Sequence, residues 1–436
     1  MTTTLRPRIS RRVATALPRG TALVGGGTAV LGLASYVHLS AANHALSGDP
    51  DSTAAFSVLW TLVFSIGLGL FFPVEQEITR VVAARKVTGD GARPALRRGA
   101  MLSGALLCCA LLPLAVLARP IADLLFGGGL SLVLSLAGAF TALACAHVVR
   151  GVLAGLGLFR AYGVQLGLDG VLRIVLSLAL AAAGVRSVFA FAAVLTVAPL
   201  VSVAATVRPA LAGAEPGSPV PWQEMSRRLG MLVGSTLLAQ LLVNIAVIST
   251  EVISTGDSEL VTALLAALVL ARVPLFVFGA FQVSLLRGLS TAAAEGDRRG
   301  YARLLLRAVT VTGALGAAGG VCAVVLGPAL LPALLSAPDI LTAADFGWLA
   351  FGTTAYMIAM VLGQALITSG GAREQLAAWT AGTAVLVVLT LSPLPLRDRV
   401  EIAYAAGALV VGLCMAGALR VRARRLGGRW TSPAAP

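Results

Sequence analysis

Charged residues are scarce in this chain of 436 residues. They make up 12% of the sequence, and lysine occurs once, as Lys86. Soluble globular domains carry about 25% charged residues, so the composition excludes an ordinary water-soluble fold. Lys86 follows no glycine-rich loop, and a P-loop needs its lysine there. The chain is therefore not a P-loop nucleotide hydrolase.

Cysteine and histidine are also rare, with five and three copies. All five cysteines fall inside apolar stretches, as Cys108, Cys109, Cys145, Cys322 and Cys414. They show neither metal-ligand spacing nor an extracellular pair, so we expect packing roles, no metal and no cofactor. His38 and His147 also lie in apolar stretches, where we expect hydrogen-bonded packing residues.

Long apolar runs are what the chain has in abundance. Hydrophobic residues make up 58% of the sequence, and a run of about 20 spans the hydrocarbon core as a helix. No run sustains the alternation of a transmembrane strand. The sequence predicts an all-α polytopic membrane protein with about 12 transmembrane helices, at roughly 21–46, 54–79, 99–118, 131–149, 162–184, 187–207, 229–254, 260–286, 304–326, 346–369, 375–392 and 400–419.

The cations sort into alternate gaps between these runs. The gaps expected outside the cell hold only Arg119, Arg186, Arg397 and Arg399. Cationic loops stay in the cytoplasm during insertion, so we predict a multi-pass protein of the cell membrane with both termini cytoplasmic. We therefore expect the net charge of +14 to set the membrane topology and to bind membrane lipids, and we expect no binding to nucleic acid. The run 21–46 is too long for a cleaved signal peptide and is interpreted as the first helix.

The two halves of the chain resemble each other. Arg80 precedes Gly89-Asp90 by the same spacing that separates Arg287 from Gly296-Asp297, which favours duplication of a six-helix unit. An even number of helices makes the repeats parallel, with a substrate site between the lobes. We predict a basic tail (1–20), an N-lobe (21–208), a linker (209–228), a C-lobe (229–420) and a second basic tail (421–436).

Three segments resemble those of polysaccharide flippases. The run from Leu270 to Ser290 (LARVPLFVFGAFQVSLLRGLS) is similar to their eighth helix, and the run from Arg150 to Tyr162 (RGVLAGLGLFRAY) resembles their turn between helices 4 and 5. Asp169 and Arg173 resemble the acid and arginine of their fifth helix. The chain thus resembles the multidrug/oligosaccharidyl-lipid/polysaccharide (MOP) exporter superfamily, nearest its Wzx-like polysaccharide branch.

That resemblance implies two six-helix bundles that alternate between faces. The implied function is a flippase that moves a polyprenyl-pyrophosphate-linked glycan from the inner to the outer leaflet, as a monomer and alongside glycan-assembly enzymes. The alternative within the superfamily is a MATE-type cation-coupled drug or small-molecule exporter. A membrane glycan-processing enzyme is less favoured, because the predicted external loops are too short to carry a catalytic platform. We therefore expect no enzymatic activity.

Charges deep in the membrane are the first candidates for substrate binding, because burying them in lipid is costly. Arg173 and Arg272 each lie about 16–18 Å from a helix end, at roughly 1.5 Å per residue. Two guanidiniums near one plane suit a pyrophosphate. For Arg173 the alternative is a structural ion pair with Asp169, four residues earlier on the same helix face.

Uncharged polar residues and helix-breaking prolines complete the candidate set. Gln240 and Asn244 could bind sugar hydroxyls or hold helices together. For gating or ion coupling we select Glu75, Glu77, Pro73 and Pro274; the alternative for the glutamates is pairing with Arg80 or neighbouring loops, and the prolines are expected to kink their helices.

Overall fold

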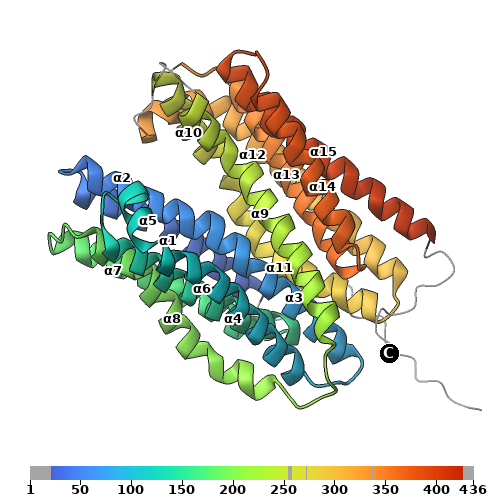
Figure 1. Ribbon diagram of the computed structural model, residues 1–436. Helices are drawn as coiled ribbons and strands as arrows, with labels where there is room; N and C mark the ends of the chain where they lie inside the picture. Colours follow the sequence, from blue (N-terminus) through green and yellow to red (C-terminus); the bar gives the residue numbers. More distant parts are fainter. Residues whose placement is uncertain (1–20, 254–257, 272, 336–337, 339, 426–436) are drawn as a thin grey trace, which may run out of the picture.

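The computed structural model describes residues 21–253, 258–271, 273–335, 338 and 340–425 (Figure 1). These residues are helical throughout apart from turns and short connections. The predicted all-α class is confirmed, and the arrangement in two bundles is consistent with two six-helix repeats.

The first bundle, the N-lobe, comprises the described helices between Thr21 and Gly213. Six of its helices or continuous helix runs are long and apolar enough to cross a membrane. Its elements are α1 (Thr21–Leu46), α2 (Pro50–Leu62), the π-helical η1 (Val63–Gly67), α3 (Leu68–Val87), α4 (Arg93–Val116), the short α5 (Ala118–Leu125), α6 (Leu130–Leu156), α7 (Phe159–Ala182) and α8 (Val188–Gly213).

The second bundle, the C-lobe, repeats this order of long helices. Its elements are α9 (Trp222–Ile253), α10 (Ser258–Ala271), α11 (Val273–Ala294), α12 (Arg298–Leu335), α13 (Ala343–Thr368), α14 (Ala372–Thr390) and α15 (Leu396–Arg425). Of these, α12, α13 and α15 also meet the length and hydropathy of a membrane span, which gives nine spans among the described residues. With α9, the α10–α11 pair and α14 in the three remaining positions, the fold matches the expected twelve.

Local signals fix where several helices begin and end. Asp49 caps α2, accepting a hydrogen bond from the Asp51 backbone N–H at 3.2 Å, and Pro50 opens the helix. Gly157 ends α6 in the left-handed conformation, with φ of 74°, where glycine carries no steric penalty. Helices run further than the apolar stretches because their cationic ends are helical too. The non-helical linker is accordingly 214–221, shorter than the predicted 209–228.

Glycines let the N-lobe helices pack backbone against backbone. A β-carbon placed on Gly27 of α1 would lie 2.5 Å from the Gly163 carbonyl of α7, and one on Gly151 of α6 would lie 3.0 Å from the Glu75 carbonyl of α3. Gly151 and Gly163 each begin a Gly-x-x-x-Gly spacing, which permits this close approach of helices. These contacts join α1 to α7 and α3 to α6.

The two lobes approach each other where α3 and α1 meet α9 and α11 (Figure 1). They are further apart at the end that carries α2 and α10, which gives the pair a V shape. We call the opposite end, with the 214–221 segment and the α3–α4 loop, the linker end. The packing role expected for the cysteines was wrong: all five are free and exposed, because they lie on outward faces of their helices rather than in the bundle interiors.

Candidate functional site

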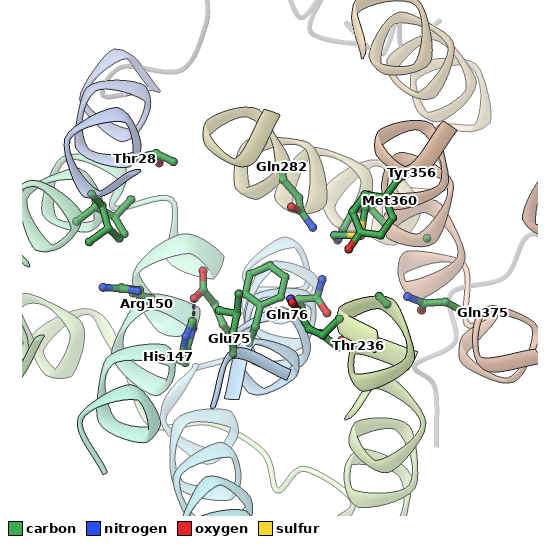
Figure 2. Close-up of a pocket in the computed structure, with 18 of the residues that line it drawn as sticks. Thr28, Glu75, Gln76, His147, Arg150, Thr236, Gln282, Tyr356, Met360 and Gln375 are labelled. Carbon is green, nitrogen blue, oxygen red and sulfur yellow. Dashed lines mark hydrogen bonds and ion pairs between the residues drawn. The ribbon is translucent and has the colours of Figure 1, made fainter. Parts of the chain in front are cut away.

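A cavity of about 280 Å³ lies between the lobes. Its walls come from α1, α3, α6 and α7 of the N-lobe and from α9, α11, α13 and α14 of the C-lobe. Ligand pockets usually measure about 300–1,000 Å³, so the cavity lies just below the lower end of that range and suits a compact group such as one sugar ring. Figure 2 shows Glu75, His147 and Arg150 on one side and Gln282, Tyr356 and Gln375 across from them.

The N-lobe wall holds a hydrogen-bonded carboxylate. Glu75 on α3 accepts a hydrogen bond from the Tyr162 hydroxyl at 2.7 Å, and its other oxygen lies 2.7 Å from His147 Nδ1 (Figure 2). His147 Nε2 is buried without a hydrogen-bond partner among the described residues. Glu75 is thus fixed by two neighbouring helices, while one imidazole nitrogen stays open.

A buried ion cluster continues this wall. Asp169 on α7 binds Arg150 of α6 at 3.0 Å and Arg173 of α7 at 2.9 Å. Each of the three side chains is at most 7% exposed. Arg150 lines the cavity, whereas Asp169 and Arg173 do not belong to its lining. One carboxylate therefore neutralises half of the charge of two arginines.

The C-lobe wall is neutral and rich in carboxamides. Gln240, Gln282, Gln364 and Gln375 line it, and Gln76 of α3 lies between the lobes. Four of the five have a buried amide atom without a partner among the described residues, namely Gln76 Oε1, Gln282 Nε2, Gln364 Oε1 and Gln375 Oε1. An unsatisfied buried polar group costs about 1–3 kcal/mol, so these amides call for a ligand or water.

The linker end is closed by contacts between the lobes. Arg80 binds Glu77 of the same helix with two hydrogen bonds, at 2.7 and 2.9 Å. Arg228 of α9 lies 3.9 Å from Glu77 and donates to the Ile367 carbonyl at 3.1 Å. Arg287 of α11 stacks over the Phe159 ring of α7, 5.4 Å from its centroid.

The linker itself is held by the N-lobe. Asp90, in the α3–α4 loop, accepts hydrogen bonds from the Ser218 backbone N–H at 2.9 Å and from the Ser218 hydroxyl. Arg85 donates to the Ser218 carbonyl at 2.6 Å. These hydrogen bonds, with Arg85 nearby, hold the pKa of Asp90 below its ordinary value. We call this set of contacts, centred on Asp90 and Ser218, the linker clamp.

The residues selected from the sequence lie in different parts of this site. Glu75 and Gln240 line the cavity, and Asp169 and Arg173 form the ion pair behind it. Glu77 pairs with Arg80, which was the alternative to a gating role, and lies outside the cavity lining. Arg272 and the Asn244 side chain lie outside the described residues.

The two prolines occupy different settings. Pro73 lies inside α3, one and a half turns after the π-helical segment η1, and is buried. Pro274 is the second described residue of α11 (Val273–Ala294). A β-carbon on Gly319 of α12 would lie 2.6 Å from Pro274 Cγ. Their role in gating stays a prediction.

Sequence reasoning missed His147, Arg150 and four of the five glutamines as cavity residues. His147 makes the hydrogen bond expected of a packing residue, and it also faces the cavity. Arg150 follows the apolar run 131–149 and so resembled a loop cation, but α6 continues to Leu156. The available signal was the spacing of His147 and Arg150, three residues apart and hence on one helix face.

Comparison with known proteins supports the fold. No protein-family model matches the chain. Curated proteins from Mycobacterium bovis and Mycobacterium tuberculosis, both described as uncharacterized, are 26% identical over 403 residues, covering 89% of this chain and 89% of theirs.

Solved structures align over nearly the whole chain. A MATE protein in complex with MaL6 has a TM-score of 0.75 at 16% identity, covering 94% of this chain and all of the other. An outward-facing multidrug resistance MATE transporter of the MOP superfamily has a TM-score of 0.71 at 17% identity, with 95% and 100% coverage. A MOP superfamily transporter from Pyrococcus furiosus has a TM-score of 0.70 at 18% identity, with 94% and 100% coverage. The protein therefore has the fold of MATE transporters in the MOP superfamily, and it is a multi-pass membrane protein.

Proposed function

We propose that the protein exports a lipid-linked saccharide across the membrane by alternating access, with the inter-lobe cavity as the headgroup site. The observation that carries this proposal is the set of four cavity carboxamides that each have one buried amide atom without a hydrogen-bond partner in the described part of the chain. Carboxamides donate and accept at once, which suits sugar hydroxyls. The aromatic rings of Tyr356 and Trp379 beside them offer apolar faces to a sugar ring.

The charge of the cavity also supports this substrate class. Arg150 is the cation among the described lining residues, and Glu75 is the carboxylate, already engaged by Tyr162 and His147. A site for cationic drugs would be expected to present a free carboxylate. The Pyrococcus furiosus transporter is described as having a binding pocket of reversed polarity, which supports the idea that this fold accommodates pockets of different charge.

The proposal is tested in vesicles that contain the purified protein and a fluorescent, short-chain pyrophosphate-linked saccharide. The measurement is the fraction of probe that becomes accessible to a membrane-impermeant quencher with time. Gln282→Leu combined with Gln375→Leu should slow this transfer roughly tenfold, because each lost hydrogen bond is worth about 0.5–1.5 kcal/mol.

Gln165→Leu is the matched control, because Gln165 is fully buried in the N-lobe outside the cavity lining. Its transfer rate should stay near that of the unaltered protein. Equal rates for the double variant and the control would contradict a saccharide site at these amides.

The second candidate function, a cation-coupled small-molecule exporter, rests on Glu75. A carboxylate at the cavity wall with a neighbouring imidazole could exchange a proton for a cation. A lipophilic cation that displaces a proton from the cavity, and that crosses the vesicle membrane faster than the saccharide probe, would favour this function.

A further inference from the structure

The open nitrogen of His147 marks where the cavity can take up a proton. Its Nδ1 lies 2.7 Å from Glu75, so in the neutral ring Nδ1–H donates to the carboxylate and Nε2 carries the lone pair. Nε2 is buried and has no partner among the described residues, and His147 itself is 2% exposed. A proton added at Nε2 would give an imidazolium that keeps Glu75 as its counter-ion.

The charges around this pair cancel when the imidazole is neutral. Glu75 and Asp169 carry two negative charges, and Arg150 and Arg173 carry two positive ones. Proton uptake at His147 therefore changes the sum for the N-lobe wall from zero to plus one. The guanidinium of Arg150 is partly available within this wall, since its Nε has no partner among the described residues.

No other described charge faces the pair closely. Groups on the helices packed against it are neutral or engaged elsewhere. On α1, Thr28 lines the cavity and His38 binds Ser177, and on α3, Glu77 binds Arg80. The lining groups of α9 and α11 are neutral (Thr236, Gln240 and Gln282), and the charged residues of α4 lie near the linker end (Arg93, Arg97 and Arg98). The proton on His147 is thus the variable charge of the described cavity.

We propose that the cavity binds a phosphate-containing anion together with a proton, with His147 as the proton acceptor and Arg150 as the anion contact. This inference rests on the proposed function and narrows it: the recognised group is the phosphodiester or pyrophosphate diester of the substrate. Binding of the proton then raises the affinity for the substrate, and binding of the substrate raises the affinity for the proton. In a cation exporter with a carboxylate site they would compete.

The test is calorimetric binding of citronellyl-diphospho-N-acetylglucosamine to the detergent-solubilised full-length protein. A pyrophosphate diester lacks the ionisation near pH 6 of a terminal phosphate, so its charge is constant from pH 5.5 to 8. Titrations in buffers of different ionisation enthalpy give the number of protons exchanged. We expect uptake approaching one proton per ligand where the imidazole is neutral, and affinity that falls up to tenfold per pH unit as pH rises.

Three variants separate charge from structure. Glu75→Gln removes the counter-ion and fixes the wall at plus one, so binding should be tight at all pH values without proton uptake. His147→Gln fixes the wall at zero, so binding should be weak at all pH values, again without uptake. Arg150→Gln should lower affinity at least tenfold at both ends of the pH range. Glu374→Gln, whose carboxylate pairs with Arg422 at the surface, is the control and should bind like the unaltered protein.

Proton release on binding, or unchanged affinity in Arg150→Gln, would overturn the inference. Equal effects of Glu75→Gln and His147→Gln on the affinity would also overturn the inference, because a pair with a purely structural role predicts equal effects. If proton-linked binding is found but the vesicles show no saccharide transfer, the flippase function fails while the anion site stands. If the vesicles show transfer but binding is not linked to a proton, the proton-linked anion site fails while the flippase function stands.

Discussion

Asp169 has an unusual position at the residue scale, because one carboxylate serves two buried arginines on different helices. Arg150 and Arg173 each reach a different oxygen, Oδ2 and Oδ1. Removing one member of a buried ion pair costs about 3–5 kcal/mol, mainly because the remaining charge is left without compensation. The cluster therefore links α6 to α7 and fixes the position of Arg150 at the cavity.

We expect Asp169→Asn to be the most destabilising substitution in this cluster, because it leaves two buried cations unpaired. Arg150→Gln and Arg173→Gln each leave Asp169 with one partner and should lower stability less. The measurement is the melting temperature of the solubilised protein, followed by loss of the monodisperse elution peak. A melting temperature for Asp169→Asn at or above those of the arginine variants would contradict this order.

At the scale of elements, the linker clamp shows how the duplicated halves have diverged. Asp90 binds the linker, whereas its counterpart Asp297 accepts a hydrogen bond from the Gly300 backbone N–H of the next helix at 2.9 Å. The 214–221 linker follows the first copy. The clamp thus attaches residues 214–221 to the N-lobe, and the junction with the C-lobe begins at α9.

Asp90→Ala should accelerate amide hydrogen exchange of Gly217 and Ser218 severalfold, because the Ser218 N–H loses its acceptor. Asp297→Ala is the matched control and should leave that exchange unchanged. The pKa of Asp90 is lowered, so the clamp persists above the ordinary aspartate value of about 3.9 and is lost only as pH falls through the lower folded value. Intrinsic-rate-corrected exchange that rises between pH 8 and 5.5 would contradict this assignment.

Helices and lobes were predictable because they depend on local properties of the chain. Apolar run length located each span, but several helices extend well beyond the predicted run: α3 ends at Val87, eight residues after the predicted end at 79. The cavity depends on which helix faces meet, as in the contact between Glu75 and His147, 72 residues apart. Arg173 was selected because it is charged, but no spacing rule shows that it lies behind Arg150 rather than in the cavity lining. Gln364 and Gln375 carry no charge, and nothing in their local sequence distinguishes a cavity amide from a helix-packing one.

At the scale of the whole molecule, the direction of transport depends on topology. Reporter fusions at Gly89, Ser218 and Glu295 should report the cytoplasm, and fusions at Asp51, Gly128 and Asp257 should report the outside. The reason is the concentration of arginine in the first group of loops. A single clear inversion among the six fusions would contradict the twelve-span arrangement.

The unequal charge of the two walls has an electrical consequence. A pyrophosphate diester carries two negative charges, and one accompanying proton cancels one of them. If the lobes themselves return to the same place in each cycle, one net negative charge leaves the cell per substrate. A potential of 100 mV, negative inside, would then contribute about 2.3 kcal/mol to each export event. The proton stoichiometry of binding decides this figure: without a proton two negative charges would cross and the contribution would double, and in either case membrane voltage would favour export without a co-transported metal ion.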